Sequence, residues 1–312
     1  MTGRPEVGAL IPLVLITLVF AALSPTFLSG SSVATMLNAV AFIGIIVVGQ
    51  TFLLVIGGLD LSVGSVAGLA AVVAAVLLRD FGWPVGLALP AGVAVGAVIG
   101  LANAILVVRC GIPAFIATLG MMYIARGIDY LVCNGYPIAP LPAEVRQFAE
   151  ILPSGVSWAL LAFITAVVAG DLVLRRTVFG RSLYAIGGNE EVARLAGIRT
   201  GLVKGSCYVL TGALAGLAGV LVMVQVNVGQ PEIGAGWELD TIASVVIGGV
   251  SLFGGVGTVL GALIGLLIMQ VVRSGLVSCD VSPHWQTVAV GLIMILAVGA
   301  DLLRRRFRNG RT

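Results

Sequence analysis

The feature that most constrains this chain is a series of long apolar segments that recurs along the whole sequence. A helix needs about 20 apolar residues to cross the hydrocarbon core of a membrane. Hydrophobic residues make up 59% of the 312 positions and charged residues only 10%, whereas soluble domains carry about a quarter charged residues. The sequence therefore predicts an all-α polytopic membrane protein with about ten transmembrane helices. The segments that meet or approach the required length are 8–28, 35–57, 61–79, 84–108, 114–132, 155–174, 203–226, 239–254, 257–276 and 285–303.

The basic residues are concentrated in the loop 175–204 and near the C-terminus. They are Arg175, Arg176, Arg181, Arg194, Arg199 and Lys204 in the loop, and Arg304, Arg305, Arg306, Arg308 and Arg311 in the tail. The positive-inside rule assigns such clusters to the cytoplasmic side. Ten spans place both termini on one side, and six spans precede the loop, so the charges and the span count agree. A cytoplasmic flank also explains the basic tail without a nucleic-acid partner.

The N-terminal stretch has some features of a signal peptide, because Arg4 precedes an apolar run. No clear small-residue cleavage site follows it. Removing this span would also leave an odd number of crossings, so we expect residues 8–28 to remain as the first span.

Two places in the apolar pattern are interrupted by glycine. The segment 239–254 is short and runs into "IGGVSLFGGVG", and the spans 35–57 and 61–79 are separated only by "GGLDLS". Broken spans of this kind are typical of transporters, in which unwound backbone faces protein or an aqueous cavity. The chain has 43 glycines, which predicts close helix packing. "VVRCG" at 107–111 and "VVRSG" at 271–275 are compatible with an inverted repeat of two halves, or with chance.

Several classes of function lack the residues they need. No span holds an acidic residue securely at its centre, and the single histidine, His284, lies at a span edge. Proton- and sodium-coupled carriers usually need ionisable groups at membrane depth. The four cysteines show no metal or disulfide spacing, and no P-loop motif is present. We therefore expect no enzyme, no metal and no cofactor on this chain, and an energy source on a separate subunit.

The stretch "GNEEVARLAGIRTGLVK" (188–204) predicts one short, well-capped helix in the basic loop. Asn189 is a good N-cap, and Glu190 and Glu191 complement the positive end of the helix. Val192, Leu195 and Ala196 form a small apolar face, and Gly197 is placed to end the helix. Two turns are too short to be stable alone. The helix is expected to dock into a groove of a partner, or alternatively to pack on its own loop.

Three motifs, spread across most of the chain, resemble the ribose/xylose/arabinose-type permeases of bacterial ATP-binding-cassette (ABC) sugar importers. They are "IGGLDLSVGSVAGL" (56–69), "FGRSLYAIGGNEEVARLAGI" (179–198) and "QPEIGAGWELDTIASVVIGGVSLFGG" (230–255). The sequence departs from the family at Val250 and Phe253, where smaller or polar residues are frequent.

The resemblance implies that the second motif contacts a cytoplasmic ATPase with two nucleotide-binding domains, which would hold ATP and Mg. It also implies a second permease chain, identical or related, and a periplasmic sugar-binding protein. The residues expected to couple to the ATPase are Gly180, Arg181, Gly187, Asn189, Glu190, Glu191, Val192, Arg194, Leu195, Ala196 and Gly197.

Neutral amides inside or beside the spans are candidates for the solute pathway, since sugars are uncharged and amides both donate and accept hydrogen bonds. A buried amide can equally bond across helices. Asp60 and Ser62 are candidates for a helix cap or for a cytoplasmic gate, and Asp60 could alternatively contact the ATPase. The pathway candidates are Asn38, Gln50, Asn103, Gln225 and Asn227.

The largest loop on the other side, 133–155, contains "AEVRQFAEI". This stretch predicts a short amphipathic helix with Val145, Phe148 and Ile151 on one side. It would lie at the membrane interface or dock an external partner.

Together these features predict a single permease domain over 1–312, in the bacterial inner membrane and in contact with lipid. It would import a monosaccharide-like solute by alternating access. The alternatives are an ABC permease for another small polar solute, such as a branched-chain amino acid or a furanone-like signal, and a passive solute channel. The sequence does not identify the solute.

Overall fold

The computed structural model describes residues 5–149 and 157–309, and it is built from helices. Arg4, Arg311 and Ile151 lie outside the described residues. Within them there is no β-strand, and Ile138 and Gly229 form an isolated antiparallel bridge. The helices are α1 (Pro5–Leu23), α2 (Gly30–Val55), α3 (Val63–Arg79), α4 (Val85–Ala104) with a π-helical turn (Ile105–Arg109), α5 (Ala114–Cys133), α6 (Arg146–Ala149) after a 3-10 turn (Ala143–Val145), α7 (Trp158–Arg176), α8 (Val178–Gly188), α9 (Glu190–Leu195), α10 (Thr200–Val226), α11 (Trp237–Ile247), α12 (Val259–Ser278) and α13 (Pro283–Asn309).

Each of the ten predicted segments contains a helix, but the helices differ in length. Among the residues that the structure describes, six helices are long and apolar enough to cross a membrane: Gly30–Val55, Val85–Arg109, Ala114–Cys133, Trp158–Arg176, Thr200–Val226 and Val259–Ser278. The apolar parts of α1 and α3 are shorter, and α11 has 11 residues. The multi-pass helical architecture is therefore confirmed, whereas the count of ten crossings stays a prediction.

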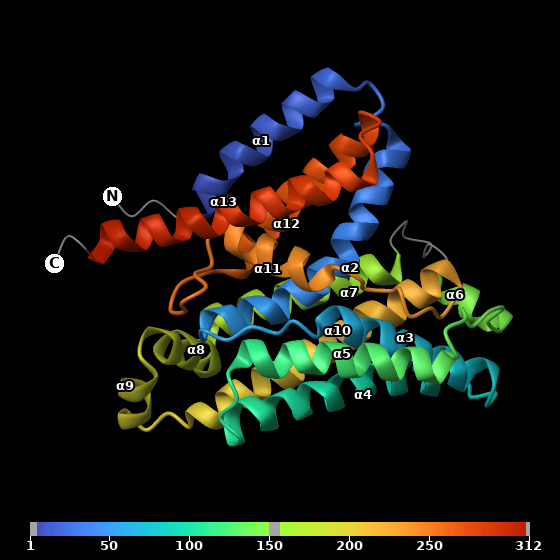
Figure 1. Cartoon of the computed structure of the whole chain (residues 1–312), viewed down its shortest axis with the longest axis horizontal. Coiled ribbons are helices and arrows are strands. Elements are labelled where there is room, and N and C mark those ends of the chain that lie inside the picture. The colour runs from blue at the N-terminus through green and yellow to red at the C-terminus, as the bar shows by residue number, and fades with distance from the viewer. Residues whose placement is uncertain (1–4, 150–156, 310–312) are drawn as a thin grey trace.

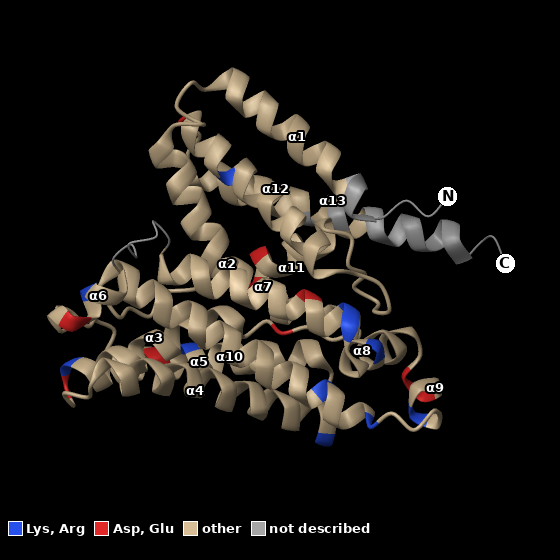
Figure 2. Cartoon of the chain, turned by 180° about the vertical axis from the view of Figure 1, so that it is seen from behind, with Lys and Arg blue, Asp and Glu red and all other residues tan. Residues whose placement is uncertain are grey.

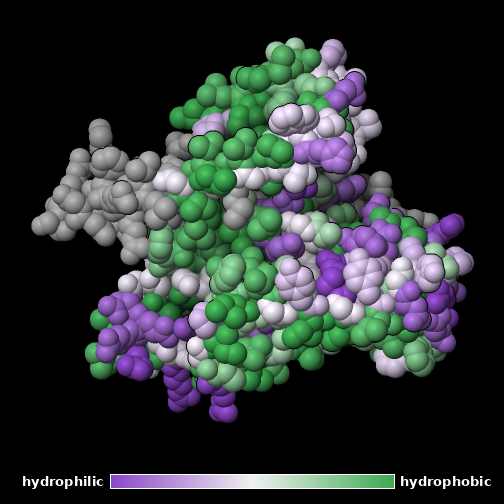
Figure 3. Space-filling view, in the orientation of Figure 1, coloured by the Kyte–Doolittle hydropathy of each residue, from purple (hydrophilic) through white to green (hydrophobic). Residues whose placement is uncertain are grey.

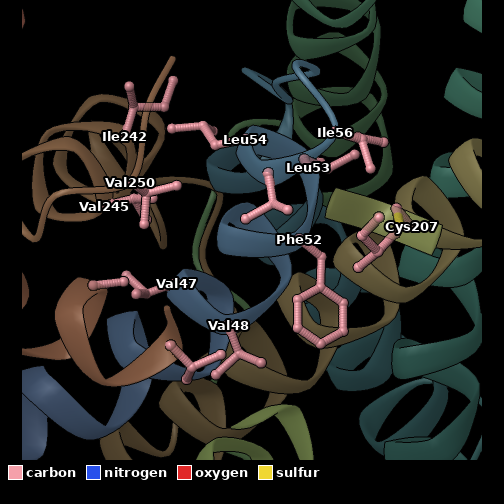
Figure 4. Close-up of a cluster of buried hydrophobic side chains, with 14 of the residues drawn as sticks. Val47, Val48, Phe52, Leu53, Leu54, Ile56, Cys207, Ile242, Val245 and Val250 are labelled. Carbon is pink, nitrogen blue, oxygen red and sulfur yellow. The ribbon is translucent and has the colours of Figure 1, made fainter. Parts of the chain in front are cut away.

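Helix α2 lies between two groups of helices (Figure 1). On one side are α1, α12 and α13, and on the other are α3, α4, α5 and α10. From Val40 to Val55 every residue of α2 is buried, as expected for a helix that is apolar on all sides. Val47, Phe52 and Leu54 of α2 pack with side chains of α10 and α11 in one hydrophobic cluster (Figure 4). The core of the molecule therefore surrounds this central helix.

Helices α4 and α10 cross backbone to backbone. Gly96 on α4 faces Gly212 on α10, and a Cβ added to either one would overlap the carbonyl oxygen of the other. Gly92 and Gly100, one turn away on each side, likewise lie against α10. Small residues at this spacing let two membrane helices approach closely. The prediction that glycines produce tight packing is confirmed here.

The bundle has two ends, at which different segments of the chain lie. The start of α1 and the end of α13 lie at the same end as α8 and α9, whereas α6 lies at the opposite end (Figure 1). Most of the charged residues that the structure describes belong to segments at these two ends (Figure 2). In Figure 3 apolar surface covers much of the area between them. This distribution suits a body whose middle faces lipid.

The predicted short helix in the loop 133–155 is present but brief. The 3-10 turn and α6 together cover residues 143–149. Val145 is buried, and Phe148 packs against Trp158 with ring centroids 6.2 Å apart. The loop therefore folds back onto the bundle.

The other sequence features have varied surroundings. Cys133 and Cys207 are buried, and Cys110 is exposed. Arg109 is exposed, whereas Arg273 forms an ion pair with Asp240, so the two arginines of the suspected repeat differ in environment. The inverted repeat stays a prediction.

Candidate functional site

Helix α9 is capped at both ends by its own sequence. The Oδ1 atom of Asn189 accepts hydrogen bonds from the backbone N–H groups of Glu191, at 3.0 Å, and Val192, at 3.1 Å. At the other end Gly197 has a φ of +86°. The Gly197 N–H bonds to Arg194 O, and the Ile198 N–H bonds to Ala193 O. These two bonds form a Schellman motif. The six-residue helix is therefore capped at both ends by residues of its own segment.

The apolar face of α9 points away from the chain. Leu195 is 81% exposed and Val192 is 58% exposed, and Ala196 is also exposed. Ala193, on the opposite side, is 3% exposed and belongs to the main hydrophobic cluster. The helix is thus anchored by one small residue and presents its larger side chains outward, next to the hydrophilic surface at that end of the molecule (Figure 3).

Charged side chains on and beside α9 form two ion pairs. Glu190 forms an ion pair with Lys204 of α10 at 2.9 Å, and Glu191 lies 3.9 Å from Arg194. Arg181 on α8 is exposed. Exposed pairs of this kind contribute little to stability, about 0–1 kcal/mol each. Of the two pairs, Glu190–Lys204 joins α9 to the start of α10, and Glu191–Arg194 lies within α9.

Two glycines of α8 allow close contact with neighbouring backbone. A Cβ on Gly180 would overlap the carbonyl oxygen of Leu174 at the end of α7. A Cβ on Gly187 would overlap the carbonyl oxygen of Val55 at the end of α2. The candidate coupling residues therefore divide into two groups. Gly180 is buried and Gly187 packs against the end of α2, whereas Arg181 of α8 and most of the α9 candidates are exposed.

The N-cap gives a first testable prediction. We expect Asn189→Ala to remove the two bonds to Glu191 and Val192 and to destabilise α9 by about 1 kcal/mol. Amide hydrogen exchange of peptides covering 188–198 should then be roughly five times faster. Asn189→Asp keeps the acceptor and serves as the control. Unchanged exchange in the alanine variant would show that α9 is held by other contacts.

A second polar group lies inside the bundle, around the segment between α2 and α3. The Oδ1 atom of Asp60 accepts from the backbone N–H of Ser62, at 2.7 Å, and from its hydroxyl, at 2.6 Å. Asn103 of α4 donates to Asp60 Oδ2, at 3.2 Å, and to Ser62 Oγ, at 2.9 Å. Gln50 of α2 donates to the carbonyl oxygen of Asp60 at 3.2 Å. All four side chains are 0–1% exposed, and we refer to them as the Asp60 network.

The geometry assigns different positions to Asp60 and Ser62. Ser62 occupies the N-cap position of α3, and Asp60 accepts from Ser62 rather than from the first turn of the helix. Two amide oxygens of the network, Gln50 Oε1 and Asn103 Oδ1, have no hydrogen-bond partner within the described residues. The network joins α2, the segment 56–62, α3 and α4 through a single buried carboxylate.

The five candidate pathway amides do not meet in one place. Gln50 and Asn103 belong to the Asp60 network. Asn38 is half-buried and lies 12 residues earlier on α2, about 18 Å along the helix axis. Gln225 is exposed near the end of α10, and Asn227 ends that helix in the left-handed conformation with φ +56°. No continuous pathway follows from these residues within one chain.

Sequence reasoning did not identify two polar contacts. The guanidinium of Arg126 on α5 contacts the carbonyl oxygen of Pro231 and lies 3.5 Å from Asp129. Arg273 on α12 pairs with Asp240 on α11 at 2.6 Å. Arg126 and Asp129 are three residues apart on α5, whereas the contacts of Arg126 with Pro231 and of Arg273 with Asp240 join residues that are far apart in sequence. Only the single charges inside apolar segments signalled these contacts.

A third missed feature is an open pocket of about 710 Å³, most of whose lining residues are serines and threonines. Serines and threonines between positions 26 and 35 line one side, and Ser274 and Ser278 of α12 line another. Arg273 also reaches it.

The two departures from the family pattern have different surroundings. Val250 is 1% exposed and packs in the main hydrophobic cluster beside Val245 (Figure 4). Phe253 is 46% exposed, in the loop between α11 and α12.

Comparison with known proteins gives a consistent result. Residues 32–298 match the family model described as "Branched-chain amino acid transport system / permease component". The chain is 37% identical over 297 residues to the L-arabinose ABC transporter permease protein AraH of Azospirillum brasilense, covering 93% of this chain and 86% of that protein. It is 36% identical over 302 residues to the ribose import permease protein RbsC of Escherichia coli (strain K12), covering 95% and 93%. It is 35% identical over 323 residues to the galactose/methyl galactoside import permease protein MglC of the same organism, covering 97% and 96%.

Proposed function

We infer the function of this chain from its family: it belongs to the branched-chain amino acid transport system / permease component family, and it is the permease subunit of an ABC importer. It is a multi-pass membrane protein and a transport subunit rather than an enzyme. Importers of this kind work with an ATPase and with a substrate-binding partner. The observation that carries the inference is the identity of 35–37% to sugar import permeases over nearly the whole chain.

The proposed solute is a monosaccharide-like molecule. The three relatives described above are named for arabinose, ribose and galactose. The family description also names branched-chain amino acids. The names of the three relatives favour a sugar over an amino acid for this chain.

The proposed mechanism is alternating access driven from outside this chain. The ATPase, with two nucleotide-binding domains that hold ATP and Mg, would grip the surface of α8 and α9. The candidate contacts are the exposed side chains of Val192 and Leu195, with Glu190, Glu191, Arg181 and Arg194 around them. The exposed apolar face of α9 supports this role, because an exposed apolar pair on a rigid, capped helix suits insertion into a groove.

The remaining parts of the proposal concern assembly and orientation. Two permease chains, identical or related, would form the solute route, with a periplasmic sugar-binding protein on the side of α6. Ten crossings would place both termini on the cytoplasmic side with α8 and α9. The common position of the start of α1, the end of α13 and α8–α9 supports this orientation (Figure 1).

The function has a direct test. The tagged chain is purified with its associated subunits from native membranes and reconstituted into proteoliposomes. We expect ATP-dependent uptake of at least one of ribose, arabinose and galactose, and none of leucine or valine. Leucine uptake alone would support the amino-acid alternative. Uptake that does not require ATP, from a preparation without a nucleotide-binding subunit, would support the passive channel.

A further inference from the structure

Three glycine pairs that are far apart in the sequence meet at one point of the fold. They are Gly57–Gly58 after α2, Gly187–Gly188 at the end of α8, and Gly254–Gly255 in the loop between α11 and α12. A Cβ on Gly254 would lie 3.0 Å from the Cα of Gly187 and 3.0 Å from the backbone nitrogen of Gly57. We call this meeting point the glycine junction.

The glycine junction caps the C-terminal end of α2. The N–H groups of Gly57 and Gly58 bond to Leu54 O, at 2.9 Å, and Leu53 O, at 2.8 Å. Gly57 has a φ of +75°, so these bonds form a Schellman motif. The next free carbonyl, that of Val55, accepts from the N–H of Gly255 at 2.8 Å. The loop between α11 and α12 thus supplies the hydrogen-bond donor for a backbone carbonyl at the buried end of α2.

Helix α8 packs directly against this hydrogen bond between Val55 and Gly255. A Cβ on Gly187 would overlap both the Val55 carbonyl oxygen and the Gly255 nitrogen, so these atoms are in contact with the α8 backbone. Three residues earlier on α8, the hydroxyl of Tyr184 donates to the carbonyl oxygen of Gly257 at 2.6 Å. Because no side chain separates Gly187 from Val55 and Gly255, no change of rotamer can absorb a displacement of α8.

The junction is continuous with both parts of the candidate site. On one side Asn189 alone separates α8 from α9. On the other side Gly58 comes two residues before Asp60, and Tyr208 donates to the carbonyl oxygen of Leu59 at 3.4 Å. The segment 56–62 therefore runs from the α8 contact directly into the Asp60 network.

We propose that the glycine junction transmits displacement of α8 and α9 to the Asp60 network and to the loop between α11 and α12, with Gly187 as the positioning residue of the contact. The inference rests on the proposed function, because it needs an ATPase that moves α8 and α9. It adds the route by which that movement reaches two separate parts of the bundle.

The test compares Gly187→Ala with Gly205→Ala in the purified complex in proteoliposomes. A Cβ on Gly205, in α10, would lie 3.7 Å from the Cβ of Ala104, which is ordinary contact. ATP hydrolysis and solute uptake are measured in the same vesicles. We expect Gly187→Ala to lower uptake per ATP hydrolysed by about tenfold, within the usual range of coupling energies. Gly205→Ala should match the unaltered complex. Uptake per ATP hydrolysed does not depend on how much folded protein the vesicles contain. The ratio therefore distinguishes a loss of coupling from a loss of stability.

A milder variant covers the case in which Gly187→Ala does not assemble. Tyr184→Phe removes the hydroxyl that reaches Gly257 and leaves the ring in place, and we expect a several-fold fall in uptake per ATP, at the lower end of the same range. Unchanged ratios in every variant that assembles would overturn the proposal while leaving the importer function intact. Absence of ATP-driven uptake in the unaltered complex would overturn the proposed function itself, and the inference with it.

Discussion

Leu195→Asp is expected to abolish ATP-driven uptake while leaving the chain folded. Leu195 is 81% exposed on the apolar face of α9, so the substitution removes no internal packing. A carboxylate placed in an apolar groove would lose its hydration without gaining a partner. Central apolar contacts of interfaces are worth about 2–4 kcal/mol, or roughly 30- to 700-fold in Kd. We therefore expect loss of the ATPase during purification, measured by its ratio to the permease chain, together with loss of uptake.

The matched control is Leu202→Asp. Leu202 is 67% exposed near the start of α10, at the same end of the molecule but outside α8 and α9. This variant should retain the ATPase. Glu190→Arg is a less specific test of docking than Leu195→Asp, because it would also break the ion pair with Lys204. Full retention of the ATPase by Leu195→Asp would remove α9 from the docking surface.

Asp60→Leu should produce the largest loss of stability. The carboxylate accepts from the backbone and hydroxyl of Ser62 and from Asn103, and it is 1% exposed. Leucine offers no acceptor, so three buried donors lose their partner. Breaking a buried network of this kind costs about 3–5 kcal/mol. The measurement is the unfolding midpoint of the purified chain in detergent. It is monitored through the loss of monodisperse protein on heating.

Asp60→Asn distinguishes hydrogen bonding from packing at the same position. Asparagine has nearly the shape of aspartate and keeps one acceptor for Ser62, but it points an amide donor toward the amide of Asn103. We expect a smaller loss, about 1–2 kcal/mol. Equal unfolding midpoints for the leucine variant and the unaltered chain would show that the network does not support the fold.

Local features of the site were predictable from sequence, and features made by distant segments were not. The capped helix at α9 follows from Asn189 and Gly197, because capping involves residues three or four apart. The contact of Gly187 with Val55 depends on how α8 lies across α2, which no local pattern contains. The same holds for the pair Arg273 and Asp240, whose residues lie on different helices.

The fold was predictable to a similar degree. Apolar segments of membrane length indicated where helices lie, because burial in lipid requires their length and composition. The glycines of "IGGVSLFGGVG" indicated an interruption of the segment 239–254, and α11 ends there, at Ile247, before Gly248 and Gly249. The sequence left both Asp60 and Ser62 as candidate caps of α3, since both residue types favour that position, and Ser62 occupies it.

The crossing of α4 and α10 limits how the bundle can change shape. Where Gly96 and Gly212 touch main chain to main chain, neither helix can rotate or slide without a steric clash with the other. The two should behave as one stiff rod throughout the transport cycle. Any opening and closing must then take place at other helix contacts of the bundle, with α4 and α10 moving together.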